Sequence, residues 1–73
     1  MEAEMYEVSV QRKQRGGFYQ QIFWAVDPTL ERAKEIACAL KMFPTYRDGS
    51  REVTYSDING EYKMYVLRLD RWW

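Results

Sequence analysis

The stretch that decides the fold is Asp27-Pro-Thr-Leu-Glu-Arg-Ala-Lys-Glu-Ile-Ala-Cys-Ala-Leu-Lys-Met42, which carries the one clear helical pattern of the chain. Apolar residues recur in it at steps of three and four, the spacing of one helical face. They are Leu30, Ala33, Ile36, Ala37 and Leu40. Because two of them are alanines, the helix can lie close on a sheet. The spacing therefore predicts an amphipathic helix that packs its apolar face against strands.

The limits of this helix follow from the residues that flank it. Thr29 is the preferred N-cap, because its hydroxyl can accept a backbone N–H of the first turn, and Asp27 with Pro28 at the first helical position is the alternative start. Pro44 is expected to end the pattern, since proline has no N–H to donate and disfavours the α conformation in the residue before it. Cys38 lies beside the apolar face, and we expect its thiol to be buried.

Two strands joined by a hairpin loop are expected before the helix. The first, residues 5–11, alternates with period two, which is typical of a half-buried strand. Its apolar members are Tyr6, Val8 and Val10. Residues 12–17 form the loop, because Gly16-Gly17 permits positive φ. Residues 18–26 form the second strand, but both of its faces carry large apolar side chains, so the pattern leaves open which face meets the helix.

Two further strands are expected after the helix, at residues 51–56 and 61–69. Residues 43–50 are expected to be a loop, because they contain several residues that break regular structure. Asn59-Gly60 is the strongest turn signal of the chain, since a type I′ turn needs positive φ at both of its central positions. A two-residue turn there pairs Tyr55 with Met64 and Val53 with Val66.

This order of elements predicts a single α+β domain over residues 1–73, with a four-stranded antiparallel sheet and one helix on one face (ββαββ). One helix covers one face, so the other face stays open, and here it carries large apolar groups where such a face is normally polar. The expected open-face aromatics are Tyr65 with Tyr19 or Phe23. Nucleic-acid bases could stack on them, a protein partner or a second copy could bury them, or Trp72-Trp73 could fold back over them.

The composition argues against several classes of function. The net charge is zero, whereas proteins that bind polyanions are usually strongly basic. The chain has no histidine, the commonest general base, and no Cys/His cluster with metal-ligand spacing, so we expect no enzyme activity, no cofactor and no metal site. It also shows no signal-peptide pattern and no stretch apolar enough to span a membrane. With one cysteine, the expected location is cytoplasmic.

Arg12, Lys13 and Arg15 form the only dense cluster of one charge sign, set in the glycine-bearing loop. Guanidinium groups and backbone N–H groups can hold a phosphate or a carboxylate there, although a basic hairpin tip can also serve only as a solvated turn. Lys34 and Lys41, one heptad apart on the helix, could extend this basic surface. We therefore expect partner contacts at these five residues, and a second region of contact at the sheet aromatics Tyr19, Phe23 and Tyr65.

The stretch Thr29-Leu30-Glu31-Arg32-Ala33-Lys34-Glu35-Ile36-Ala37 resembles the helix of small phage-borne inhibitors of type I CRISPR surveillance complexes, whose pattern is Ser/Thr-Leu-x-x-Ala-Lys-x-Ile-Ala. The charged first hairpin, the later Asn59-Gly60 hairpin and a final strand ending near a Trp are similar too. Pro28 and the Trp72-Trp73 ending depart from that pattern.

The resemblance implies the ββαββ fold and a non-enzymatic, anti-CRISPR type of protein in the host-cell cytoplasm. Such a protein would occupy a basic or nucleic-acid-binding surface of a large complex. The alternative function is a small nucleic-acid-binding module that uses the basic loop and the sheet aromatics. The sequence does not decide between a monomer and a homodimer.

Overall fold

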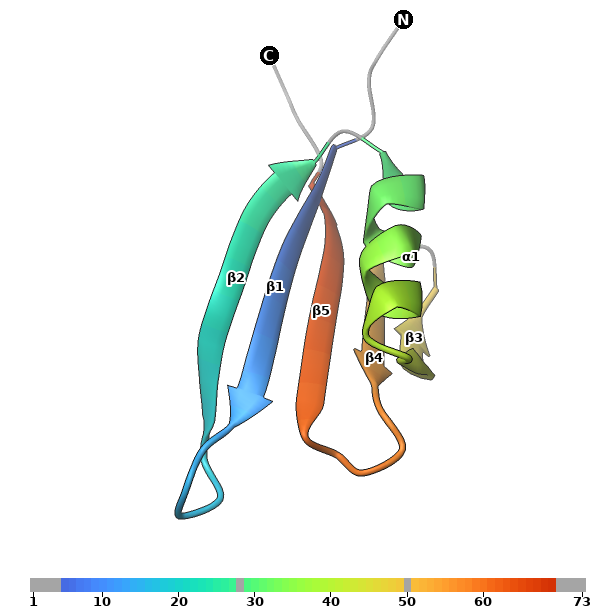
Figure 1. Cartoon of the computed structure of the whole chain (residues 1–73). Coiled ribbons are helices and arrows are strands. Elements are labelled where there is room, and N and C mark those ends of the chain that lie inside the picture. Colours follow the sequence, from blue (N-terminus) through green and yellow to red (C-terminus); the bar gives the residue numbers. More distant parts are fainter. Residues whose placement is uncertain (1–4, 28, 50, 70–73) are drawn as a thin grey trace, which may run out of the picture.

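The computed structural model describes residues 5–27, 29–49 and 51–69. In chain order its elements are β1 (Met5–Lys13), β2 (Tyr19–Asp27), α1 (Leu30–Ala39), β3 (Phe43–Asp48), β4 (Glu52–Ser56) and β5 (Tyr62–Leu69). The strands form one antiparallel sheet in the order β2-β1-β5-β4-β3, and α1 lies on one face of it (Figure 1). The α+β class is therefore confirmed. Within the described residues, no helix has the length and apolar character needed to cross a membrane.

The sheet has five strands, so the prediction of four was wrong. The additional strand β3 lies in the stretch that was expected to be a loop, and all six of its residues are exposed. Without alternating burial, its sequence lacks the period-two pattern by which a strand is recognised. Pro44 is tolerated opposite Tyr55 because β3 is an edge strand, whose outer side needs no N–H donor.

The core lies between α1 and the sheet face that α1 covers. Val8 and Met64 are 0% exposed, and so is Ala33 of the helix. Alternate residues of the two central strands thus form the floor of the core, and a small helix residue allows close approach. The other buried members are Tyr6, Val10, Ala37, Met42, Tyr55 and Val66, with Leu30, Ile36, Leu40, Val53 and Tyr62 packed against them. The predicted helix face and the predicted core strands are confirmed.

The β4–β5 turn has the predicted register but not the predicted turn type. Tyr55 pairs with Met64, as expected. Gly60 has φ 68°, and its N–H donates to the carbonyl oxygen of Asp57 at 3.1 Å. Asn59 does not have the positive φ that a type I′ turn requires, because Lys41 is the only described non-glycine residue with one. The Asp57 carboxylate also accepts the backbone N–H of Tyr62 at 2.9 Å, which ties the turn to the start of β5.

Helix α1 begins where the sequence predicts. The Thr29 side chain accepts a hydrogen bond from the backbone N–H of Arg32 at 3.4 Å, as an N-cap does. The alternative start at Asp27 is wrong, since that residue still belongs to β2. Cys38 lies on the solvent side of the helix and is exposed, so the expected burial of its thiol is also wrong. It follows the buried Ala37 in sequence, but one residue along a helix turns the side chain by about 100°.

The end of α1 is set by local hydrogen bonds rather than by Pro44. The N–H of Met42 donates to the carbonyl oxygen of Ala37 at 2.8 Å, and the N–H of Lys41 donates to that of Cys38 at 3.1 Å. This pair of bonds is the Schellman motif, in which one residue takes the left-handed conformation that glycine normally supplies. Here that residue is Lys41, with φ 53°. Met42 is buried, so the motif also directs an apolar side chain into the core.

Replacing Lys41 with glycine should raise the free energy of unfolding by about 1 kcal/mol. The left-handed conformation costs a residue with a Cβ roughly 1–2 kcal/mol, and glycine avoids most of that cost. Lys41→Ala removes the same charge but keeps the Cβ, so it is the matched control and should be close to neutral. The urea midpoints of the two variants provide the measurement. Equal midpoints would mean that the backbone at this position carries no strain.

Candidate partner-binding site

The sheet face opposite α1 carries an aromatic row that crosses all five strands. Reading across the register, the row runs from Trp24 through Ser9, Tyr65 and Thr54 to Tyr46. Trp24 and Tyr46, at the two edges, are 54% and 57% exposed. No described element covers this face (Figure 1). The row therefore presents two large side chains that the fold itself does not use.

A row of carboxylates lies next to the aromatic row on the same face. It runs from Val26 through Glu7, Leu67 and Glu52 to Asp48. Val26 and Leu67 are each 36% exposed, so apolar groups alternate here with the acids. We call the two rows together the acidic-aromatic face. Residues opposite each other in neighbouring strands lie about 5 Å apart, so the acids and the aromatics form one continuous patch.

The other end of this sheet face is basic rather than acidic. Lys63 and Lys13 fall on it by alternation, and the Lys63 ammonium nitrogen lies 4.2 Å from the centroid of the Tyr19 ring. The Tyr19 hydroxyl also donates to the carbonyl oxygen of Gly60. Lys63 pairs with Gln11 of β1, which is four residues along that strand from Glu7 of the carboxylate row. These two positions on β1 are about 13 Å apart. The face therefore has an acidic end and a basic end.

The structure separates the three aromatic residues that the sequence proposed. Tyr19 and Tyr65 lie on the open face, as predicted for Tyr65 and as one of two options for Tyr19. Phe23 lies on the opposite face, since it pairs with the buried Val10, so it is not an open-face residue. Tyr19 is held by Lys63 and by its hydrogen bond, which leaves Tyr65 as the central aromatic of the face. The suggested cover by Trp72-Trp73 concerns residues outside the described ones.

A β-bulge explains why the alternation of β2 was unreadable. Phe23 pairs with Val10 and Gln21 pairs with Gln11, so Ile22 is an extra residue without a partner across the strand. A bulge reverses the alternation at that point. Ile22 and Phe23 both border an apolar hollow of about 300 Å³ beside α1, which we call the edge hollow. It is lined by Val10, Ile22, Phe23, Ile36, Ala39 and Leu40, with Arg32 alongside.

The predicted basic loop is not a single basic site. Strand β1 extends to Lys13, so Arg12 and Lys13 are strand residues that point to opposite faces, and only Arg15 lies in the turn. The Arg12 guanidinium pairs with the carboxylate of Glu61 at 3.1 Å and lies 5.7 Å from the Tyr62 ring centroid. The N–H of Gly17, which could have held an anion, donates instead to Gln14 at 3.0 Å.

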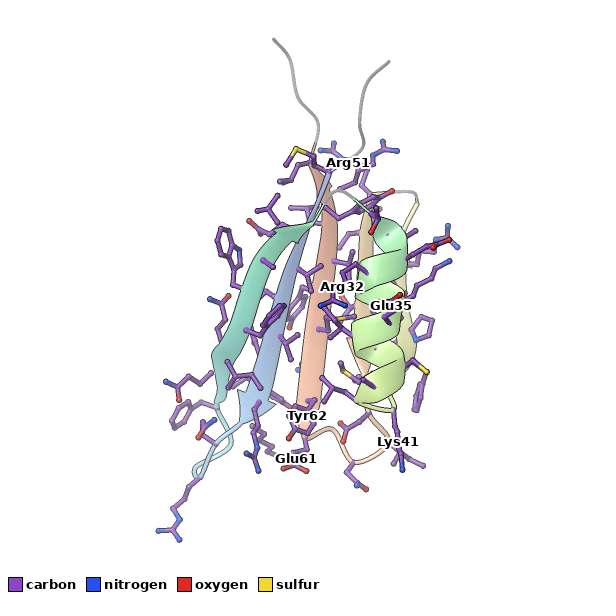
Figure 2. All side chains as sticks on the ribbon, turned by 45° about the horizontal axis from the view of Figure 1, so that its top comes forward. Arg32, Glu35, Lys41, Arg51, Glu61 and Tyr62 are labelled. Atoms are coloured by element: carbon purple, nitrogen blue, oxygen red, sulfur yellow. The ribbon has the colours of Figure 1, made fainter. Side chains whose placement is uncertain are left out.

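Lys34 and Lys41 do not extend this cluster. Lys34 is exposed on α1, and Lys41 follows the C-terminal end of the helix, where Figure 2 places it away from Glu61 and Tyr62, to which Arg12 is bound. The five cations are thus distributed over β1, the β1–β2 turn, α1 and the residue beyond the end of α1, and over both sides of the sheet. Their role in partner contact stays a prediction, and the geometry favours Lys13 and Arg15 among them.

Sequence reasoning missed the members of the acidic-aromatic face that belong to β3 and β2. Tyr46 and Asp48 lie in the strand that was expected to be a loop, and Trp24 follows the bulge. Glu7 and Glu52 could have been found, because they alternate with residues that the sequence places in the core. The signal that indicates them is the charge on the strand faces opposite those core residues.

Comparison of the chain with protein families, with curated proteins and with solved structures found no match. The resemblance to phage-borne inhibitors of CRISPR complexes therefore stays a prediction from the sequence.

Proposed function

We propose that this protein is a non-enzymatic inhibitor that covers a basic, nucleic-acid-binding surface of a larger protein complex, with type I CRISPR surveillance complexes as the first target to test. The observation that carries the proposal is the acidic-aromatic face. Its carboxylates Glu7, Glu52 and Asp48 can meet arginine and lysine side chains that otherwise hold phosphates. Trp24, Tyr46 and Tyr65 supply the apolar contact area that aromatic side chains provide at interfaces.

The nucleic-acid-binding alternative is less well supported by the same face. Single-stranded nucleic acids bind where aromatic platforms lie in a positively charged groove. Here the carboxylates of Glu7 and Glu52 lie beside the aromatic row and would repel phosphates. Of the three cations of the expected basic loop, Arg12 is paired with Glu61. The two functions differ in what they bind, so one set of measurements separates them.

The test uses purified type I surveillance complexes loaded with guide RNA, and it measures the binding of a labelled target duplex by fluorescence anisotropy. Wild-type protein should abolish duplex binding at about one copy per complex. The double variant Glu7→Lys/Glu52→Lys should bind the complex at least about tenfold more weakly, because like charges then face each other. Glu31→Lys, a reversal in the first turn of α1, is the control and should inhibit as wild type does.

Lys13→Glu/Arg15→Glu tests the basic end of the face without breaking the Arg12 pair. It should speed association with the basic target surface, because two repelling cations become carboxylates, and leave the inhibited state intact, since exposed charges at a rim act mainly on encounter. If the wild-type protein leaves duplex binding by complexes of every subtype unchanged, the proposed target is wrong. If it instead retains a labelled single strand by itself, with an affinity that falls steeply with salt, the nucleic-acid-binding function is correct.

A further inference from the structure

We propose that the protein forms a homodimer in which β2 of one copy pairs antiparallel with β2 of the second, so that the edge hollows of the two copies close over each other. This inference does not rest on the proposed function, because it concerns pairing at the free edge of the sheet, and only Trp24 and Val26 belong both to this edge and to the acidic-aromatic face. At that edge β2 is the outermost strand (Figure 1), so one side of its backbone has no described strand beside it.

The two edges of the sheet differ in how they resist pairing. Natural edge strands are protected by proline, by charged residues, by short length or by a bulge. β3 has Pro44, Arg47 and Asp48 among its six residues. β2 has nine residues, and from Tyr19 to Val26 it contains no charge, no proline and no glycine. Within these eight residues, the bulge at Ile22 is the only protective feature. The β2 edge is therefore built to accept another strand.

The side chains along β2 indicate that this strand comes from a second copy. In a two-fold symmetric interface the same patch must provide both the group that inserts and the hollow that receives it. Ile22 and Phe23 are 52% and 43% exposed, although they are apolar and lie on the side of the helix. Directly beside them lies the edge hollow, which Ile36 and Leu40 of α1 border. The same patch thus provides both the apolar side chains that insert and the hollow that receives them.

The charges beside the hollow also fit a second copy. Arg32 borders the hollow and pairs with Glu35 of the same helix at 3.2 Å, and Figure 2 shows both on α1. A two-fold axis perpendicular to the sheet places both helices on the same face and runs them antiparallel. In that arrangement the patch of one copy faces the same patch of the second copy. The cation of each can lie opposite the carboxylate of the other, so like charges do not oppose each other. A strongly charged foreign strand would have no matching partner at this edge.

The exposed area is sufficient for a weak, specific dimer. A fully buried aromatic side chain removes 150–250 Å² from water, so Trp24 and Phe23, at about half exposure, offer roughly 100 Å² each. With Ile22, Val26 and the backbone of β2, the two copies together approach roughly 1,000 Å², the lower limit for a specific interface. Antiparallel pairing also satisfies the outward N–H and C=O groups of β2.

The first experiment is sedimentation equilibrium of the full chain between about 10 μM and 1 mM, the range in which a weak interface of this size is populated. The mean mass should rise from one chain towards two. Phe23→Lys should remain a monomer over this range, because it places a charge at the centre of the patch. Tyr46→Lys makes the same kind of change on the β3 edge at a comparable exposure, and it should dimerise as wild type does. Near-ultraviolet circular dichroism checks that each variant is folded.

The second experiment is amide hydrogen exchange at the two ends of this concentration range. Amides of β2 should exchange more slowly at 1 mM by at least about threefold, while those of β3 should not change, because only one edge becomes paired. A wild-type chain that stays monomeric at 1 mM overturns the proposal and leaves the edge for a strand of another protein. A dimer that survives Phe23→Lys, or that is lost in Tyr65→Glu, also overturns it, because the interface then lies elsewhere.

Discussion

Replacing Met64 with alanine should lower the free energy of unfolding by about 2–5 kcal/mol. The side chain is 0% exposed at the centre of the sheet, so its removal loses buried apolar contact and leaves a cavity that close-packed neighbours cannot fill. A chain of this length is expected to have a stability of roughly 4–11 kcal/mol, so the variant should lose a large part of its stability and unfold at a much lower urea concentration.

Ile36→Ala is the matched comparison for Met64→Ala. Ile36 is only partly buried and borders the edge hollow, so part of its surface is in water before the substitution. We expect a loss of about 1–2 kcal/mol, smaller than that for Met64. Urea unfolding followed by tryptophan fluorescence measures both values. Equal losses at the two positions would mean that the hollow is closed in solution, and a negligible loss at Met64 would place the core elsewhere.

Replacing Ala33 with leucine should lower the free energy of unfolding by about 1–3 kcal/mol or more. Ala33 is 0% exposed between α1 and the sheet, and a longer side chain there must push the helix away from the sheet. The cost is that of overpacking, since leucine and alanine are both strong helix formers.

Ala39→Leu is the same substitution six residues further along the same helix, where it serves as the control. Ala39 is exposed and lines the edge hollow, so the added carbon atoms enter open space. Its stability should be unchanged or slightly higher. The urea midpoints of the two variants should therefore differ by more than the error of the measurement. If both variants lose stability equally, the helix does not approach the sheet as closely as Ala33 indicates.

Most of the fold could be predicted because its central elements follow simple periods. α1, β1 and β5 each bury one face, so apolar residues recur at steps of three and four in α1 and at every second position in the two strands. The register of β4 on β5 followed from the position of Gly60, although the turn itself is of another type. These elements are predictable because their side chains all meet in one core.

The unpredicted parts lie at the two edges of the sheet, where burial no longer organises the sequence. β3 is exposed along its whole length, and the bulge at Ile22 changes the alternation of β2 in the middle of the strand. The sequence therefore left open which face Phe23 lies on, and Tyr46 was not placed in a strand. The basic cluster was misread for a related reason: Arg12 continues β1, and its partner Glu61 is distant in sequence, so its pairing could not be read locally.

The placement of β1 beside β5 has a consequence for how the protein is made. Val8 and Val66 face each other in the middle of the sheet, although most of the chain separates them. Of the described strands, β1 leaves the ribosome first and β5 last, so β1 has only β2 as a partner until β5 has been synthesised. The loop that must then close is long, and such non-local pairing is slow. The nascent chain is therefore exposed to wrong strand pairing until β5 is translated.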